Sequence, residues 1–280
     1  MSGASKDMIV DCHTHIHGEV DGERVLRAMD AAGVDRIVLF AMSPLELIAA
    51  GVDKGKAHQT SIDQVAGVAA ADRDRIIPFA WIEPTLTDAV EAVDYGLGDR
   101  HVQGVKMIPQ RWYPYDECAQ ACYMRINTWG APMAFHSGSL GGTSDTSRFC
   151  RPVYWEVLLK YPRIRFSMAH LGWPWVDEGF AVMIEFRTTA ERLRDREWQS
   201  YADTANEPPQ AYRLQKLPSG IAIVGDTHFL YGSDSKSVED PEALRYYIRW
   251  ERRTLEELGL SQESIAGIMG KNALTWLGID

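Results

Sequence analysis

The chain has 280 residues, of which 45% are hydrophobic and 24% are charged, and this composition is typical of a globular protein with a large core. Disordered, collagen-like and coiled-coil architectures are therefore excluded. The formal net charge is -10. It argues against nucleic acids and anionic membrane surfaces as partners, because both are bound by clustered Lys and Arg side chains.

No stretch of the sequence reaches the roughly 18 uninterrupted apolar residues of a membrane span. The segment Met1–Val10 also lacks the apolar centre of a signal peptide. The sequence therefore predicts a cytoplasmic protein. Its four cysteines include no CxxC pair and are too few for a disulfide framework in a chain of this length, so we expect free thiols.

Short apolar or β-branched runs that end in polar residues alternate with stretches of helical periodicity. The ranges 86–93 and 153–161 carry such helical stripes, and Asp240 followed by Pro241 is typical of a helix start. Segment 187–225 is the hardest to divide into elements. The predicted strands are Ile9–Asp11, Arg36–Phe40, Ile76–Trp81, Val102–Met107, Pro132–His136, Arg165–His170, Ser200–Asp203 and His228–Gly232.

Eight strand and helix units in 280 residues leave about 35 residues for each unit, which is close to what a closed parallel barrel needs. The sequence therefore predicts a single (β/α)8 TIM barrel over residues 1–280, with an extra helix at the C-terminal end. The alternative is an open, doubly wound sheet. That fold normally has a glycine-rich phosphate loop after an early strand, and the sequence contains neither GxGxxG nor GxxxxGK[ST].

Histidines gather at the predicted strand ends. His13 and His15 follow the first strand, His136 ends the fifth, His170 ends the sixth, and Asp234 comes just after the eighth. In a barrel of this kind, the C-terminal ends of the strands surround the active site. Because side chains alternate along a strand, His13 and His15 are expected to point into the barrel mouth, where two imidazoles can bind one metal ion.

The same alternation predicts that Cys12 and Thr14 point away from the mouth, so Cys12 is not expected to be a ligand. Each functional interpretation has a structural alternative. His170 could be a buried structural histidine, and Asp234 could be a turn residue in its Gly-Ser-Asp segment. A purely structural account, however, gives no reason for four of the eight histidines to fall at strand ends.

These residues lie in short motifs that resemble the amidohydrolase superfamily. Within it, the chain is most similar to the amidohydrolase-related branch, which includes aminocarboxymuconate semialdehyde decarboxylase, aromatic acid decarboxylases and pyrone dicarboxylate lactonase. The resemblance runs from Asp11 to Leu277. It is carried by His13-Thr14-His15, Phe135-His136-Ser137-Gly138, Ala169-His170-Leu171-Gly172, Tyr231-Gly232-Ser233-Asp234 and Ile268-Met269-Gly270-Lys271-Asn272-Ala273.

The resemblance implies that His13, His15, His136 and Asp234 hold one divalent metal ion, usually zinc. It also implies that His170 and Asp234 are catalytic, with His170 beside the bound water. Imidazole nitrogen and carboxylate oxygen are ligands that zinc prefers, and a catalytic zinc keeps one position open for water. Such an ion lowers the pKa of its water from 15.7 towards about 7, and His170 or Asp234 can then take the proton.

Cationic and aromatic side chains follow the fourth, fifth and sixth strands on the predicted active face. Lys106 stands where two-metal relatives carry a carboxylated lysine, but it could simply bind an anion or pair with a carboxylate. Arg111 and Arg151, together with Arg148, could bind a substrate carboxylate through the guanidinium fork, or could be solvated loop residues. Trp173 is expected to form a wall for a planar ligand, with helix packing as the alternative.

The sequence thus predicts a metal-dependent hydrolase of a small cyclic ester (lactone) or amide that carries a carboxylate. The alternative within the same fold is a nonoxidative decarboxylase of an unsaturated or aromatic acid. A length of 280 residues is closer to the lactonases of the branch than to its longer decarboxylases, which favours hydrolysis. A third hypothesis is a binding protein that has lost its chemistry, although all presumed ligands are present. The expected partner is a small-molecule substrate, and the chain could form a homo-oligomer.

Overall fold

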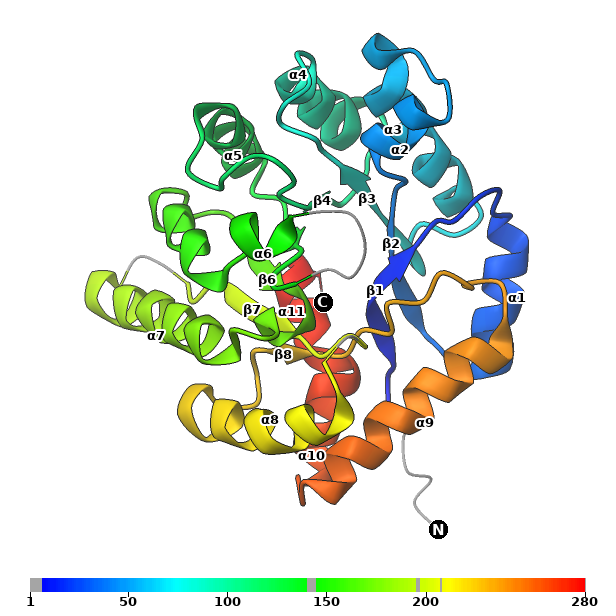
Figure 1. Cartoon of the computed structure of the whole chain (residues 1–280). Coiled ribbons are helices and arrows are strands. Elements are labelled where there is room, and N and C mark those ends of the chain that lie inside the picture. The colour runs from blue at the N-terminus through cyan, green and yellow to red at the C-terminus, as the bar shows by residue number, and fades with distance from the viewer. Residues whose placement is uncertain (1–6, 140–144, 195–196, 207, 280) are drawn as a thin grey trace.

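The computed structural model describes residues 7–139, 145–194, 197–206 and 208–279 (Figure 1). Eight parallel strands follow one another around the barrel in chain order, with helices outside them. The last and first strands are joined by the Cys12 N–H, which donates to the Tyr231 carbonyl at 2.9 Å, and by a bridge between Thr14 and Ser235. The predicted (β/α)8 TIM barrel is confirmed.

The strands agree with the prediction in number and order, but their ends differ. The first strand continues to His15, because Thr14 and His15 still pair with Leu39 and Phe40 of the second strand. The sixth strand stops at Met168, before His170. The strands are β1 (Val10–His15), β2 (Arg36–Phe40), β3 (Ile76–Trp81), β4 (Gly104–Met107), β5 (Met133–Phe135), β6 (Phe166–Met168), β7 (Ser200–Asp203) and β8 (Phe229–Leu230).

Helices pack around the outside of the barrel, and the last two follow the eighth unit. They are α1 (Gly22–Ala32), α2 (Pro44–Ala49), α3 (Ala57–Ala69), α4 (Ala89–Asp94), α5 (Glu117–Trp129), α6 (Thr146–Phe149), α7 (Val176–Leu193), α8 (Gln210–Val224), α9 (Pro241–Glu257), α10 (Gln262–Ala266) and α11 (Asn272–Leu277). The stripe at 153–161 forms a 3-10 helix, Pro152–Lys160. Asp240 caps α9 as predicted, since its side chain accepts from the Glu242 N–H.

A β-bulge in β1 changes the alternation of its side chains. Asp11 pairs with Ile37 and Thr14 pairs with Leu39, so β1 contains one residue more than β2 between these two pairs. A bulge of this kind re-aims the following side chain. Cys12 therefore packs in the apolar cluster inside the barrel, while His13 also faces inward and lines the cavity above it. Cys12 is not among the residues that line the cavity, as expected, but the bulge places it in the barrel interior, whereas simple alternation would have turned it outward.

The lower part of the barrel is filled by apolar side chains and closed by α11. Trp276 of α11 packs in the interior cluster, with its ring centroid 5.4 Å from that of Phe79. A Cβ on Gly104 would lie 2.3 Å from the Phe79 ring, so the ring occupies space that only glycine leaves free. The extra C-terminal helix thus seals the end of the barrel opposite the active site.

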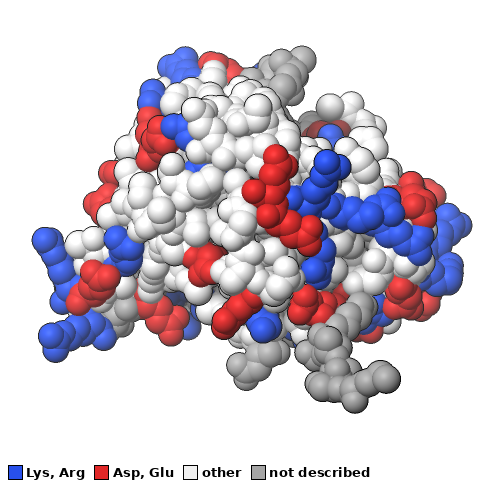
Figure 2. All heavy atoms as spheres, turned by 90° about the horizontal axis from the view of Figure 1, so that it is seen from below, with Lys and Arg blue, Asp and Glu red and all other residues white. Residues whose placement is uncertain are grey.

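The surface shows acidic and basic side chains side by side. On the face seen from below in Figure 2, Lys and Arg are interspersed with Asp and Glu, separated by broad uncharged areas. Among the helices that the structure describes, none has the length and apolar character needed to cross a membrane. Residues 1–6 lie outside the described residues, so the prediction that Met1–Val10 is not a signal peptide is not tested by the structure.

A half-buried histidine stacks with two aromatic rings near the N-terminal ends of β7 and β8. The His228 ring lies 3.5 Å from the Trp198 ring and 4.7 Å from the Tyr201 ring, centroid to centroid. Burial lowers the pKa of His228 to about 4. As the pH falls, His228 of the unfolded chain therefore binds a proton near pH 6.5, whereas in the folded protein it binds one only near pH 4. Because the unfolded state binds more protons between these pH values, the free energy of unfolding must fall as the pH is lowered through this window.

We expect the wild-type protein to lose about 1–2 kcal/mol more of its unfolding free energy between pH 7 and pH 4.5 than His228→Phe loses. Phenylalanine keeps the stack but has no proton to bind. Urea unfolding at the two pH values measures the difference. His101→Asn is the control, because His101 is exposed. Equal losses in wild type and His228→Phe would show that His228 does not contribute to acid sensitivity.

Candidate active site

A cavity of about 500 Å³ opens at the C-terminal ends of the strands. Apolar side chains, among them Met42, Leu45 and Trp81, form part of its wall. His17 and Lys236 lie at its exposed edge. Its buried and half-buried polar lining includes Ser43, Gln110 and six residues at or just after strand ends spread around the barrel: His13, His15, Lys106, His136, His170 and Asp234. The structure thus brings together every predicted metal ligand, the predicted catalytic histidine and one of the predicted substrate-binding residues.

Three potential donor atoms form a compact triangle. His13 Nε2 lies 3.2 Å from His15 Nε2 and 3.5 Å from Asp234 Oδ1, and His15 Nε2 lies 3.2 Å from the same oxygen. Donors at about 2.1 Å around a tetrahedral ion are about 3.4 Å apart. The triangle therefore has the dimensions of one face of a metal site, and these three residues are a possible metal-binding group among the described residues.

His136 supplies a further nitrogen without a competing role. Its side chain is buried, and its Nε2 has no hydrogen-bond partner among the described residues. Its ring lies 5.2 Å from the His170 ring, which in turn lies 5.0 Å from the His13 ring. A buried polar atom without a partner is costly, and binding an ion would satisfy it. The donor set thus fits a divalent metal ion.

One carboxylate that sequence reasoning missed connects the presumed ligand His13 with the presumed catalytic residue His170. Asp203 ends β7, and its Oδ2 lies 2.9 Å from His13 Nδ1. Its Oδ1 accepts from the backbone N–H groups of His170 at 2.8 Å and Ala205 at 3.1 Å. A carboxylate on Nδ1 fixes the ring so that Nε2 faces a ligand. The available signal was its position, since Asp203 ends a predicted strand as His136 and His170 do.

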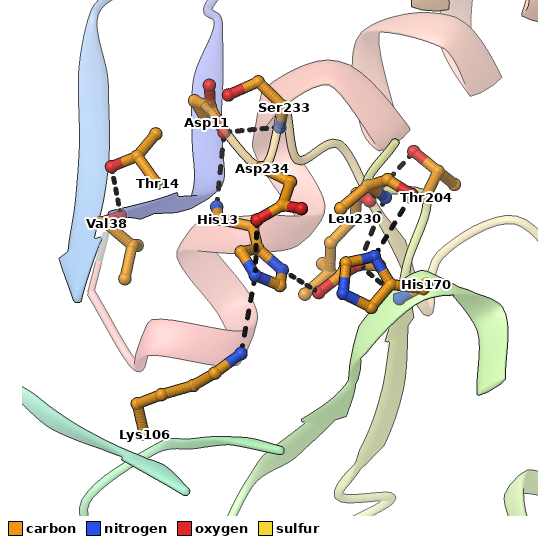
Figure 3. A network of polar contacts seen from close by, with 12 residues as sticks. Asp11, His13, Thr14, Val38, Lys106, His170, Thr204, Leu230, Ser233 and Asp234 are labelled. Atoms are coloured by element: carbon orange, nitrogen blue, oxygen red, sulfur yellow. Dashed lines mark hydrogen bonds and ion pairs between the residues drawn. The ribbon is translucent and has the colours of Figure 1, made fainter. Parts of the chain in front are cut away.

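A second missed carboxylate joins β1 to the loop after β8. Asp11 Oδ1 accepts from the backbone N–H groups of Ser233 at 2.9 Å and His13 at 3.2 Å, as Figure 3 shows. Burial outweighs these hydrogen bonds and raises the pKa of Asp11 to about 7. The Asp234 N–H donates to the His13 carbonyl at 2.8 Å. The segments that carry the presumed ligands are therefore tied to each other directly.

Two site residues, and Leu171 next to one of them, adopt backbone conformations that side chains disfavour. His170, Leu171 and Asp234 have φ angles of 57°, 56° and 55°. Each such residue costs of order 1–3 kcal/mol, and strain of this kind persists where the surroundings impose it. Here the His170 N–H is held by Asp203 and its carbonyl accepts from the Trp173 N–H at 3.0 Å. These two hydrogen bonds hold the chain in a turn that aims His170 into the cavity.

Burial sets the charges of the site. It lowers the pKa of His13, His15 and His136, so these imidazoles are neutral at pH 7 and can donate lone pairs. Burial alone would raise the pKa of Asp234, but its hydrogen bond with His15 holds the net pKa below the usual range. Burial also lowers the pKa of Lys106 to about 8. Its Nζ lies 3.4 Å from His13 Nε2 and 4.4 Å from the Phe40 ring centroid.

The other residues predicted to bind substrate lie elsewhere. Arg111 is exposed, and Arg151 forms an ion pair with Glu178. Trp173 packs partly buried against the large core cluster, and its carbonyl accepts from the Ser139 N–H at 2.9 Å. None of the three is among the described residues that line the cavity. Their role in substrate binding stays a prediction.

Comparisons with known proteins agree with this geometry. The family model described as amidohydrolase matches residues 10–279. No curated protein matches the chain significantly. Solved structures do, and one of them is 5-carboxyvanillate decarboxylase from Sphingomonas paucimobilis, with 13% identity, coverage of 98% of this chain and 100% of that chain, and a TM-score of 0.65.

Two further solved structures are similar over nearly their whole length. The 2,6-dihydroxybenzoate decarboxylase from Rhizobium has 16% identity, covers 98% of this chain and 99% of that chain, and gives a TM-score of 0.67. A 5-carboxyvanillate decarboxylase from Novosphingobium aromaticivorans, solved with manganese and 3-methoxy-4-hydroxy-5-nitrobenzoic acid, has 12% identity, 99% coverage of both chains and a TM-score of 0.69. At these identities the likeness shows the fold. The family match spans almost the whole chain, and the chain therefore belongs to the amidohydrolase family, as the motifs at its strand ends predict.

Proposed function

We propose that this protein is a metal-dependent hydrolase of a small cyclic ester or amide that carries a carboxylate. The observation that carries the proposal is the triangle of His13, His15 and Asp234 donors at the base of the cavity, with the buried His136 and His170 beside it. In this arrangement the three donor residues and the two further histidines all line the same cavity.

His13, His15, His136 and Asp234 would hold one divalent ion, for which zinc is our first choice because imidazole nitrogen and carboxylate oxygen are among its preferred ligands. When bound, the ion would polarise a substrate carbonyl and lower the pKa of a water molecule. Asp203 supports this role by fixing the His13 ring through Nδ1.

The chain itself supplies two groups for moving protons. Asp234 is ionised at neutral pH, because its hydrogen bond with His15 holds its pKa low, and its side chain keeps 27% of its surface accessible. It can therefore accept a proton from water in the cavity. His170 lines the same cavity, with its backbone fixed by Asp203. Its imidazole, when protonated, can deliver a proton to the leaving group, and the proton that Asp234 takes from water then replaces it.

Lys106 is the cation best placed to recognise the substrate carboxylate. It is buried in the cavity wall, with 1% of its surface exposed. A carboxylate brought beside it would gain a charge-assisted hydrogen bond in a site from which water is largely excluded. The carboxylate would thereby be fixed close to Asp234 and His170.

Decarboxylation of an unsaturated or aromatic acid is the second candidate. The similarity to three decarboxylase structures over at least 98% of this chain favours it. The same groups would serve that reaction in a different order: Lys106 would bind the carboxylate, and His170 or Asp234 would deliver a proton to the ring carbon.

The two reactions give different products from one panel of substrates. We expect the purified protein with zinc to open the ring of small carboxylated lactones, with proton release and no carbon dioxide. Titration of released acid and a coupled carbon dioxide assay, run on lactones and on hydroxybenzoic acids, measure both outcomes. Carbon dioxide from the aromatic acids without lactone opening would replace the first candidate by the second.

The ligand set predicts about one divalent ion per chain by elemental analysis. His13→Ala and His136→Ala are each expected to lose the ion, because each removes a donor atom. His170→Ala is expected to keep it and to lose activity by about 100-fold or more, the usual size of a general acid or base contribution. Two ions per chain, falling to one in Lys106→Ala, would instead indicate a dinuclear site with a modified lysine. Loss of the ion from His170→Ala would make His170 a ligand.

Removing the cation beside the ligands is expected to weaken substrate binding. For Lys106→Met we expect KM for the carboxylated substrate to rise about 10- to 100-fold with metal content unchanged, as a charge-assisted hydrogen bond of about 1.5–3 kcal/mol implies. Arg151→Met tests the sequence-based prediction separately. A similar rise would put the Arg151 guanidinium on the substrate, whereas an unchanged KM would leave it as the partner of Glu178. An unchanged KM in Lys106→Met would remove Lys106 from substrate recognition.

A further inference from the structure

The three residues Asp203–Ala205, which run from the last residue of β7 into the loop after it, connect the active site to the outer helices. Asp203 faces the site, where it contacts the His13 ring and the His170 N–H. Ala205 also lies at the site, because its N–H donates to Asp203 Oδ1 at 3.1 Å. The residue between them, Thr204, points the other way.

Thr204 is anchored in the layer between the barrel and the helices. Its Oγ1 donates to Glu251 Oε1 of α9 at 2.8 Å, and its N–H donates to the Leu230 carbonyl of β8 at 2.9 Å. Figure 3 shows Thr204 and Leu230 beside His170. The hydroxyl is buried, so the hydrogen bond to Glu251 fixes the rotation of this segment about the end of β7.

Glu251 is itself held by a buried arginine. Its Oε2 accepts from Arg213 Nη2 of α8 at 2.5 Å, and both side chains have 0% of their surface exposed. The Arg213 guanidinium also lies over the Trp250 ring, 4.4 Å from its centroid. An ion pair taken out of water in this way gains little net stability, because desolvation of both charges offsets their attraction. Its geometric effect is larger, because the pair leaves the Glu251 carboxylate one orientation, with Oε1 towards Thr204.

We propose that Thr204 and Glu251 are positioning residues, which fix the orientation of the Asp203 carboxylate and thereby the positions of His13 and His170 in the active site. The polar contacts run without a gap from Arg213 through Glu251 and Thr204 to the backbone that carries Asp203, and from its carboxylate to His13 and His170. A change at Thr204 therefore tilts the Asp203 carboxylate and releases both histidines together. The inference rests on the proposed function only in treating His13 as a metal ligand and His170 as the catalytic histidine.

The test removes the Thr204 hydroxyl and little else. Thr204→Val has nearly the same shape, and Thr204→Ser restores the hydroxyl. The matched control is Thr254→Val. Thr254 lies on α9 about one turn after Glu251, is buried, donates to the Trp250 carbonyl at 2.9 Å and accepts from Gln210. Both valine variants lose one buried hydroxyl in the same layer. Glu251→Gln is a secondary variant, because it leaves the Arg213 charge buried without a carboxylate and can unfold the protein by that alone.

Two readouts report on the site and one reports on the fold. Zinc affinity is measured by competition with a chromophoric chelator, the His13 Nδ1 proton by NMR of the full-length protein labelled with ¹⁵N-histidine, and the melting temperature by circular dichroism. We expect Thr204→Val to raise the zinc Kd about 10-fold, the lower end of the effect of removing support from a ligand, and to shift or broaden the His13 resonance. Thr204→Ser is expected to restore both, and Thr254→Val to change neither while lowering the melting temperature by a similar amount.

Equal zinc Kd values and unchanged His13 resonances in Thr204→Val and Thr254→Val would overturn the proposal, whatever the melting temperatures. If the wild-type protein binds no zinc, manganese or cobalt, the proposed function fails. The His13 resonance still decides the positioning role, because the hydrogen bond from His13 to Asp203 forms without an ion.

Discussion

The active site depends on the hydrogen bonds of the Asp203 carboxylate. This carboxylate is buried at the end of β7 and is shared between the His13 ring and the backbone of His170. A buried carboxylate is stable only when hydrogen bonds replace its lost hydration, and this one receives two backbone N–H groups besides the imidazole. Because the Asp203 carboxylate must keep these hydrogen bonds, it holds His13, a potential metal ligand, and His170, a potential catalytic residue, in fixed positions relative to each other.

This constraint also explains why the strained turn at His170 persists. A left-handed conformation at His170 and Leu171 is unfavourable for residues with a Cβ, and β6 ends at Met168 as the chain enters the turn. The hydrogen bond from the His170 N–H to Asp203 compensates part of that cost. On the other side of the mouth, Asp11 ties His13 to the loop that carries Asp234. Strain and compensation are thus built into the same few residues.

The charge of the cavity differs from that of the whole protein. The chain has a formal net charge of -10, and its acidic side chains repel anions at long range. Inside the cavity, burial keeps His13, His15 and His136 neutral, and Lys106 retains much of its positive charge near neutral pH, since its pKa is about 8. A bound divalent ion would make this space more positive still. Local desolvated charge, rather than net charge, therefore governs which ligands the cavity favours.

The sequence by itself determined the number and order of the strands and the gathering of His13, His15, His136 and His170, because periodicity is a local property and parallel strand ends meet at one face of a barrel. Only the tertiary structure decided the rest. The bulge that turns both Cys12 and His13 inward depends on the register of β1 against β2, not on alternation within β1. The pairing of Arg151 with Glu178, and the supports at Asp203 and Glu251, join residues far apart in the chain. Such contacts are set by which helices and strands pack together, and no local pattern encodes them.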